Sequence, residues 1–363
     1  MTEPRQLPDI TPDPRPFYEK WQETEGLDVM KGWFIEDLRK IPLKPWKRKG
    51  GLGVFINLEG TEGENDAYVC EIPPGGSLLP QRHLFEEVIF ILEGRGSTAV
   101  WHEGGKKQTF EWQPGSLFSP PLNTWHQHFN GQGNKASRYL AVTLAPPIMN
   151  TFHNGDFIFN NSFQFTDRFE EKRDYFSGEG RLCKAFDARI RIWETNFIPD
   201  ILKLDLIEWK ERGAGGKSMS FQLSENSMGA HTSSFPVGTY KKAHRHHAGA
   251  HVTILSGEGY TLMWKEGDKP QRYDWKVGSM VVPPEMWWHQ HFNVGKESAN
   301  YLAIHGRISR KHRSGLKPWK LDQDVKGGGD QIEYEDEDPM IWKMFDQELA
   351  KRGAQNLMPP LKK

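Results

Sequence analysis

Short hydrophobic stretches separated by turn residues dominate the middle of this 363-residue chain. They are rich in β-branched and aromatic side chains and are bounded by Gly, Pro and Asn, which is typical of strands joined by tight turns. Examples are Glu87–Leu92, Ser97–Trp101, Val252–Leu255 and Thr261–Trp264. The pattern predicts an all-β architecture in this part of the chain.

Helical periodicity is confined to the two ends. A short helix is expected near Pro16–Glu25, within a polar, Pro-rich beginning. A second, amphipathic helix is expected over Pro339–Arg352. Its docking stripe is expected to contain Met340, Met344 and Leu349 near one face, with Ile341, Phe345 and Ala350 beside them. We therefore expect short N- and C-terminal helical extensions around a β body.

The strand pattern occurs twice, at a constant spacing of 163 residues. Trp46 recurs as Trp209, His83 recurs as His246, and the run His126–Asn130 recurs as His289–Asn293. A constant offset of this kind indicates an internal duplication. About a hundred residues of short strands in each copy favour two double-sheet barrels of the jelly-roll kind.

The duplication divides the chain into five parts. We expect an N-terminal arm, a first barrel, an aromatic-rich connector that packs across the barrels, a second barrel, and a tail that carries the C-terminal helix. Their expected bounds are 1–31, 32–147, 148–194, 195–308 and 309–363.

Composition and charge exclude several classes of protein. The net charge of −1 argues against a general affinity for nucleic acid or for an anionic membrane, and no apolar run is long enough to span a bilayer. The first residues lack the apolar core of a signal peptide. Two cysteines, Cys70 and Cys183, do not form a disulfide framework, so a cytoplasmic protein is expected.

The second copy contains a set of histidines with metal-ligand spacing. His244 and His246 are two residues apart, so on an extended segment both imidazoles point to the same face, and His289 comes from a later strand. Three neutral nitrogen donors with open coordination positions suit Fe(II), Mn(II), Ni(II), Cu(II) or Zn(II). We predict a metal site at these three residues.

The first copy differs at two of the equivalent positions. Gln81 replaces the first histidine, and Glu87 occupies the position that is Ala250 in the second copy. With His83 and His126, these residues form a candidate second metal site. The alternative is a degenerate barrel whose polar side chains hydrogen-bond with one another.

These spacings resemble those of a known superfamily. The pattern Gly-x5-His-x-His, followed by Gly-x5-Pro-x4-His-x3-Asn, resembles the two cupin motifs, and the duplication resembles a bicupin. The three-His set without the motif glutamate resembles gentisate-type dioxygenases, although in that family the complete set belongs to the first cupin. The resemblance implies two tandem cupin barrels and Fe(II)-dependent oxidation of hydroxylated aromatic acids.

The resemblance yields a functional hypothesis with alternatives. We predict an Fe(II) dioxygenase that acts on a small, hydroxylated aromatic acid with O2 as co-substrate. A non-oxidative metal-dependent lyase, isomerase or decarboxylase, or a non-catalytic small-molecule-binding cupin, stays open. Duplicated cupins associate through their outer sheets, so a homodimer or homotetramer is expected.

Two further residues are catalytic candidates. His291 follows His289 by two residues, so both side chains face the barrel interior. Trp288 lies beside the second motif and could stack on a planar substrate. For both, a structural role in the barrel is the alternative interpretation.

Overall fold

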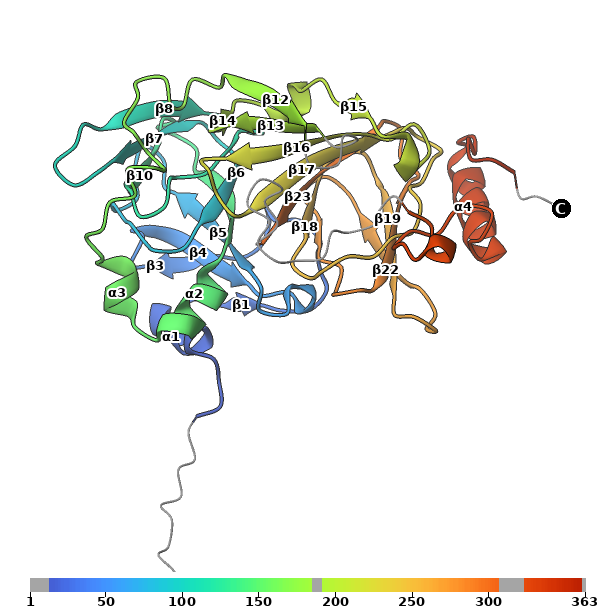
Figure 1. The fold of residues 1–363 in the computed structure, drawn as a ribbon, viewed down its shortest axis with the longest axis horizontal. Coiled ribbons are helices and arrows are strands. Elements are labelled where there is room, and N and C mark those ends of the chain that lie inside the picture. The colour runs from blue at the N-terminus through green and yellow to red at the C-terminus, as the bar shows by residue number, and fades with distance from the viewer. Residues whose placement is uncertain (1–12, 185–190, 307–322, 361–363) are drawn as a thin grey trace, which may run out of the picture.

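Two β-barrels lie side by side in the computed structural model, which describes residues 13–184, 191–306 and 323–360. The first barrel lies on the left of Figure 1, and the second lies on the right. Three short helices lie below the first barrel, and one helix flanks the second. The expected all-β fold with two tandem barrels is confirmed.

The first barrel consists of a large sheet and a three-stranded sheet. The large sheet has the order β1-β4-β5-β11-β6-β9-β14, with β3 paired to β4, and the small sheet has the order β10-β7-β8. The strands that this half of the chain contributes are β1 (Val29–Met30), β3 (Lys44–Trp46), β4 (Gly51–Ile56), β5 (Asp66–Ile72), β6 (Glu87–Glu93), β7 (Gly96–Trp101), β8 (Gln108–Trp112), β9 (Leu117–Phe118), β10 (Trp125–Asn130) and β11 (Ser137–Thr143).

The second barrel repeats this topology, with one additional strand, β12, at the edge of its large sheet. Its large sheet has the order β12-β13-β16-β17-β23-β18-β21-β2, with β15 paired to β16, and its small sheet has the order β20-β19-β22. The strands from this half are β12 (Gly180–Lys184), β13 (Arg191–Thr195), β15 (Ile207–Glu208), β16 (Lys217–Leu223), β17 (Gly229–Phe235), β18 (His251–Ser256), β19 (Gly259–Trp264), β20 (Gln271–Trp275), β21 (Met280–Val281), β22 (Trp288–Asn293) and β23 (Ala299–His305).

The two halves exchange one strand with each other. Strand β2 (Phe34–Ile35) pairs with β21 of the second barrel, and β14 (Phe197–Ile198) pairs with β9 of the first barrel. These dipeptides are equivalent in the sequence repeat, so the exchange is reciprocal. The sequence predicted that the motif was duplicated but not that each copy completes the other barrel. The domain bounds stay a prediction, because strand pairing crosses between the halves.

A single hydrophobic core also crosses between the halves. One cluster of buried side chains contains Val54 and Leu140 of the first barrel together with Phe221 and Leu302 of the second. A 3-10 turn adds a backbone contact, because Gly60 packs against the carbonyl of Val282 so closely that a Cβ would clash with it. The barrels therefore share apolar burial as well as strands.

The terminal helices lie where the sequence predicts them. Helix α1 spans Phe17–Glu25, and α4 spans Pro339–Arg352. Asp338 caps α4 by accepting a hydrogen bond from the backbone of Met340, and Gly353 ends the helix in the left-handed conformation. The expected docking of one face of α4 on the barrel is confirmed, except that Met340 points away from it.

The buried face of α4 is formed by Ile341, Phe345 and Leu349, whereas Met340 is 64% exposed. Positions i, i+4 and i+8 form one stripe of a helix, and Phe345 lies between Tyr240 and Phe292 of the barrel. This packing decides the rotation of the helix, which the apolar pattern alone left open.

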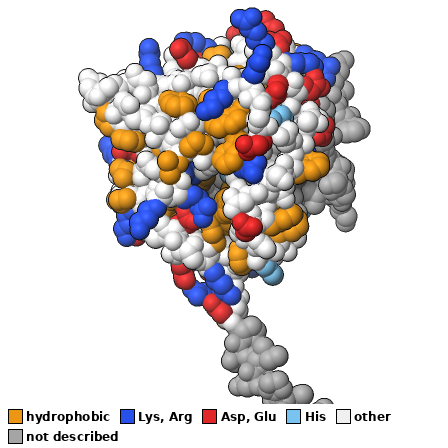
Figure 2. Space-filling view, turned by 90° about the vertical axis from the view of Figure 1, so that its left-hand side faces the viewer, with side chains coloured by type: hydrophobic (Ala, Val, Ile, Leu, Met, Phe, Trp, Pro, Cys, Tyr) orange, Lys and Arg blue, Asp and Glu red, His pale blue; other side chains and the backbone are white. Residues whose placement is uncertain are grey.

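Two helices that the sequence did not predict lie where the first barrel passes into the aromatic-rich connector, α2 (Ala145–Phe152) and α3 (Gly155–Phe159). Its Phe169 and Phe176 are buried in the core of the first barrel, whereas Phe157 and Phe163 are exposed. Figure 2 shows the face at this end of the molecule, where hydrophobic side chains are interspersed with charged ones.

In the described ranges, no helix is both long enough and apolar enough to cross a membrane.

Candidate metal centres

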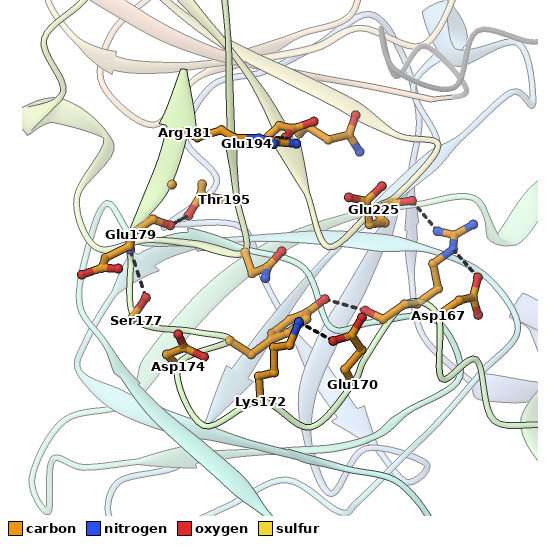
Figure 3. A pocket seen from close by; sticks show the side chains of 15 residues that line it. Asp167, Glu170, Lys172, Asp174, Ser177, Glu179, Arg181, Glu194, Thr195 and Glu225 are labelled. Carbon is orange, nitrogen blue, oxygen red and sulfur yellow. Dashed lines mark hydrogen bonds and ion pairs between the residues drawn. The ribbon is translucent and has the colours of Figure 1, made fainter. Parts of the chain in front are cut away.

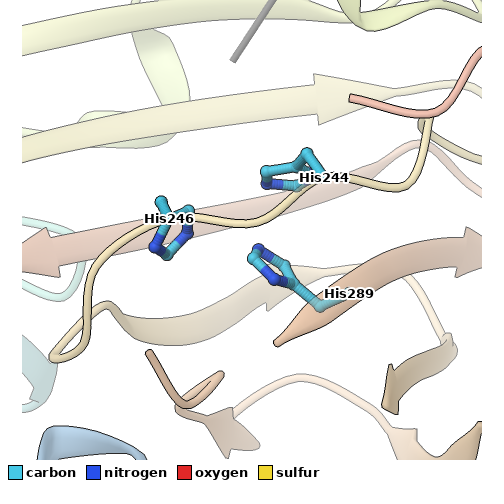
Figure 4. A group of neighbouring side chains, drawn as sticks. All are labelled: His244, His246 and His289. Carbon is cyan, nitrogen blue, oxygen red and sulfur yellow. The ribbon is translucent and has the colours of Figure 1, made fainter. Parts of the chain in front are cut away.

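The structure brings together the three histidines predicted in the second barrel. His244 and His246 lie on an extended segment, and His289 lies on β22. His244 forms an isolated backbone bridge with His289, which fixes the register between the two motifs. One ligand atom from each side chain lies within 4.8 Å of the others, and the rings converge in Figure 4.

Backbone carbonyl groups fix the orientation of these three rings. Nδ1 of His244 lies 3.3 Å from the carbonyl of Lys242, and Nδ1 of His289 lies 3.1 Å from that of Trp287. Nδ1 of His246 lies 2.7 Å from the carbonyl of His247. A carbonyl only accepts, so Nδ1 carries the proton and Nε2 carries the lone pair that a metal requires.

Burial keeps the three imidazoles neutral. It lowers the pKa of His244 and His289 well below the usual value and the pKa of His246 to about 4. The positive charge of Arg212 lowers all three pKa values further. The set is therefore deprotonated at neutral pH, and its donor chemistry fits a divalent transition metal.

Two buried cations lie near this set, and the sequence analysis missed both. Lys241 is 3% exposed, and its ammonium donates to the hydroxyls of Ser233 and, at 3.3 Å, Tyr301. Within the described part of the chain it has no carboxylate partner. Arg212 is 6% exposed and shares this interior. Lys241 thus places a buried positive charge in the barrel without a carboxylate partner among the described residues, which favours an anionic ligand.

The repeat offers a signal that could have revealed these residues. Lys241 and Ser233 correspond to Leu78 and Cys70 of the first copy. A polar residue that replaces an apolar one at an inward-facing position indicates a polar interior. The inward direction itself required the structure.

A histidine pair also lies in the second barrel. Nε2 of His305 lies 3.0 Å from Nδ1 of His231, on the neighbouring strands β23 and β17. The His305 ring centroid lies 6.0 Å from that of His246. Two more imidazoles therefore lie on the sheet wall near the three-His set, and neither was singled out from the sequence.

The first barrel holds a second cluster at the equivalent place. His83, Glu87 and His126 are all buried, and their ligand atoms lie within 4.8 Å of one another. Oε1 of Glu87 lies 3.4 Å from Nε2 of His83 and 3.3 Å from Nε2 of His126. Ligands about 2.1 Å from one metal ion are separated by roughly 3.0–3.4 Å, so this spacing fits a shared ion.

Three atoms of the first cluster are buried without a hydrogen-bond partner, namely Oε1 of Glu87 and Nε2 of His83 and His126. Nδ1 of His83 lies 2.7 Å from the carbonyl of Phe85, and Nδ1 of His126 lies 3.2 Å from that of Thr124. Buried polar atoms that converge without partners are costly, and a metal ion would satisfy them together. Gln81 lines the same cavity as His83 and Glu87, and its role as a ligand stays a prediction.

His291 occupies the same environment as His128 of the first barrel. Trp275 donates to Thr261 at 3.1 Å, and Thr261 lies 2.7 Å from Nδ1 of His291. Trp112, Thr98 and His128 repeat this chain. Burial lowers the pKa of His291 to about 3, so the ring is neutral. Because both barrels contain this arrangement, it favours a structural role for His291 in the barrel. A catalytic role for His291 stays a prediction.

Trp288 packs against Glu266 and Arg245. Its indole nitrogen donates to Glu266 at 2.9 Å, and Arg245 lies 4.5 Å from its ring centroid. Because successive residues of a strand face opposite sides, Trp288 and His289 point in different directions. The predicted stacking of Trp288 on a substrate is not tested by these contacts and stays a prediction.

A wide, charged cleft of about 650 Å³ lies between the connector and strands β12 and β13. None of the predicted site residues lines it, and its charges form local ion pairs, such as Arg181 with Glu194 and Lys172 with Glu170 (Figure 3). The candidate chemistry therefore lies in the barrels and not in this cleft.

Comparison with known proteins identifies the class. Residues 68–143 match the family described as the cupin domain, and this segment contains His83, Glu87 and His126. The first barrel is therefore built around a cupin domain, and the second barrel repeats its strand order with β12 added at the edge of the large sheet. A search of the curated proteins found no match.

Oxalate decarboxylases are among the solved structures that are similar to this chain. A mutant of the Bacillus subtilis enzyme has 14% sequence identity and a TM-score of 0.50, with 77% of this chain and 78% of that chain covered. A structure from work on the Mn(II) centres of the same enzyme has 15% identity, a TM-score of 0.50 and the same coverage. The Lactobacillus farciminis enzyme in complex with formate has 13% identity and a TM-score of 0.49, with 76% and 86% covered. At these identities the first two similarities show the bicupin fold and not the reaction.

Proposed function

We propose that the protein is a metal-dependent enzyme that acts on a small organic acid in the second barrel. The observation that carries this proposal is the set of three buried, neutral imidazoles near two buried cations. The histidines would hold a divalent metal, and Lys241 and Arg212 would hold the carboxylate of the substrate.

The finer proposal is an Fe(II)-dependent dioxygenase for hydroxylated aromatic acids. Ala250 occupies the position at which the first barrel has Glu87, so the second set lacks a carboxylate and has a smaller side chain at this position. The metal, when bound, would act as a Lewis acid toward substrate oxygens and, as Fe(II), would supply electrons to O2. The buried walls would exclude bulk water and strengthen the attraction between Lys241 and a carboxylate.

Oxygen uptake tests this finer proposal. Protein loaded with Fe(II) under anaerobic conditions should consume O2 when hydroxylated aromatic acids are added, with stoichiometric loss of the acid. His289→Ala should abolish both metal binding at this site and O2 uptake. The matched control is His247→Ala, which removes a partly exposed imidazole that pairs with Glu285. Bound Fe(II) without O2 uptake across a broad panel of acids would contradict the dioxygenase.

A non-oxidative decarboxylase or lyase is the second candidate. It is favoured by the buried cations, which fit small carboxylates in general and do not require an aromatic ring. The same assay without O2, with release of CO2 as the readout, separates the two candidates. Turnover under strictly anaerobic conditions supports decarboxylation and excludes the dioxygenase.

A further inference from the structure

We propose that the first-barrel cluster of His83, Glu87 and His126 is a structural metal site that organic substrates do not enter. In this arrangement the first barrel supports the fold, and the second barrel carries the chemistry. The proposal rests on the space beside the cluster, on the elements that cover it, and on the way in which Glu87 is held.

The space beside the cluster is very small. The cavity that His83, Glu87 and Gln81 line has a volume of about 20 Å³. A single water needs roughly 10–15 Å³, whereas a cavity that binds benzene is on the order of 150 Å³. A metal ion held by this cluster would have room for about one water and none for an aromatic acid.

Two helices and an ion pair cover the cavity. Tyr18 and Trp21 of α1 and Phe159 of α3 form part of its wall. The guanidinium of Arg48 lies 4.3 Å from the ring centroid of Phe159 and pairs with Glu25 of α1 at 2.6 Å. These side chains therefore form a packed layer over part of the cavity.

Helix α1 is fixed to the barrel by several direct contacts. The indole of Trp46 donates to Glu25 at 2.7 Å. The side-chain amides of Gln22 and Asn57 exchange two hydrogen bonds, at 3.0 and 2.8 Å. Opening the cavity would break these contacts together, which disfavours opening during turnover.

A chain of hydrogen bonds between side chains fixes the orientation of Glu87 and leaves one of its carboxylate oxygens free to bind a metal ion. The ammonium of Lys49 donates to the Tyr68 hydroxyl at 2.8 Å, and that hydroxyl donates to Oε2 of Glu87 at 2.7 Å. An ammonium can only donate and a carboxylate can only accept, so the direction of the chain is fixed. Oε1 is left to face the two histidines, and Tyr68 is a positioning residue.

The second barrel lacks this chain. Arg212, His231 and Ala250 replace Lys49, Tyr68 and Glu87 at the equivalent positions of the repeat. All three members differ together. This hydrogen-bonded chain is thus specific to the barrel with the small cavity, and it is absent from the barrel that contains Lys241 and Arg212.

Binding of Mn²⁺ alone to the full chain tests the structural role. In His289→Ala only the first cluster is intact, and in His126→Ala, the equivalent change, only the second set is intact. We expect His289→Ala to bind one Mn²⁺ with a rise in Tm, and its Mn²⁺ EPR spectrum should not change when acetate or benzoate is added. Mn²⁺ should raise the Tm of His126→Ala less than that of His289→Ala.

Two results would overturn the proposal. One is a carboxylate-induced change in the EPR spectrum of His289→Ala. The other is the absence of Mn²⁺ binding or of a Tm rise in that variant. The proposed function is tested separately, since it requires a carboxylate response in His126→Ala. If the Mn²⁺ EPR spectrum of His126→Ala does not change when a carboxylate is added, that function is contradicted, whereas the proposal of a structural site in the first barrel is unaffected.

A matched pair of variants tests the role of Tyr68 in the otherwise unchanged chain. Tyr68→Phe removes one hydroxyl, and we expect the affinity of the first cluster for Mn²⁺ to fall about 10- to 100-fold. Tyr139→Phe removes the hydroxyl of the ring beside it, 6.1 Å away between centroids, and should leave this affinity unchanged. Equal effects of the two changes, or no effect of the first, would refute the positioning role.

Infrared spectroscopy of the unsubstituted protein provides a test that does not depend on whether a variant folds. Binding of Mn²⁺ should widen the separation of the two Glu87 carboxylate stretches, as one-oxygen coordination does. A narrowed separation, which indicates coordination by both oxygens, would overturn the assignment.

Discussion

At the residue scale, the same repeat position has different chemistry in the two barrels. Glu87 and Ala250 are equivalent, and so are Lys49 and Arg212. In the first barrel a buried carboxylate balances a buried ammonium. The pKa of Glu87 lies well below its usual value, because its attraction to the neighbouring imidazoles and Lys49 outweighs burial. In the second barrel the three-His set contains no carboxylate, and Lys241 has no carboxylate partner among the described residues.

Replacing Lys241 should affect stability and ligand binding in opposite directions. Burial lowers the pKa of its ammonium, so the group is costly in the absence of an anion. Lys241→Met should leave the free energy of unfolding unchanged or raise it by about 1–2 kcal/mol, because an apolar chain of similar length replaces a buried charge. The affinity for an organic acid should fall about 10- to 100-fold, since a charge-assisted hydrogen bond is lost.

Chemical denaturation and calorimetric titration with substrate measure the two effects. Lys242→Met is the matched control, because Lys242 pairs with Glu333 and is adjacent in sequence. If Lys241→Met retained full affinity for the acid, Lys241 would not be a carboxylate anchor.

At the element scale, contacts with distant segments decide where the terminal helices pack. Helix α1 covers the first barrel, and α4 covers the small sheet of the second. Glu337, just before α4, is 8% exposed and accepts hydrogen bonds from Tyr240 and, at 3.0 Å, from Gln290. Burial raises the pKa of this carboxyl to about 7.

The raised pKa of Glu337 predicts a pH dependence of stability. A carboxyl with a raised pKa in the folded state stabilises the protein below its unfolded pKa, and this contribution is lost as pH rises through the folded value. The free energy of unfolding should therefore fall between about pH 4.5 and pH 7, by at most about 3 kcal/mol. Glu337→Gln should remove this slope in denaturant titrations, whereas the exposed Glu335→Gln should retain it. A slope that persists in Glu337→Gln would disprove the assignment.

At the scale of the whole molecule, the exchanged strands and the shared core join the barrels into one folding unit. Each large sheet ends in a strand from the other half, β14 in one and β2 in the other. Leu140 and Leu302 occupy equivalent strands of the two barrels, are fully buried, and belong to the same hydrophobic cluster. Neither barrel is complete without the other half.

Unfolding should therefore be a single cooperative transition. Leu140→Ala and Leu302→Ala should each lower the stability of the whole protein by about 2–5 kcal/mol, because each leaves a cavity in the shared core. Differential scanning calorimetry should show one peak that moves to lower temperature in both variants. Two separate peaks, with only one of them shifted by each change, would show that the barrels unfold independently.

The sequence by itself determined the strands, the duplication, both terminal helices and the two clusters of candidate ligands. Hydrophobic periodicity and turn residues are local signals, and a fixed motif spacing determines which side chains share a strand face. The structure brings His244, His246 and His289 together, and it does the same for His83, Glu87 and His126.

The tertiary structure alone decided the strand exchange, the buried cations and the cover over the first cluster. Lys241 and Lys242 are adjacent lysines, and only the packed sheet determines which of them is buried. Arg48 and Glu25 close a cavity whose lining comes from segments far apart in the chain. Such features depend on long-range contacts, which no local pattern encodes. They distinguish the site of the first barrel, which has a small cavity, from the site of the second barrel, whose buried cations suit an anion.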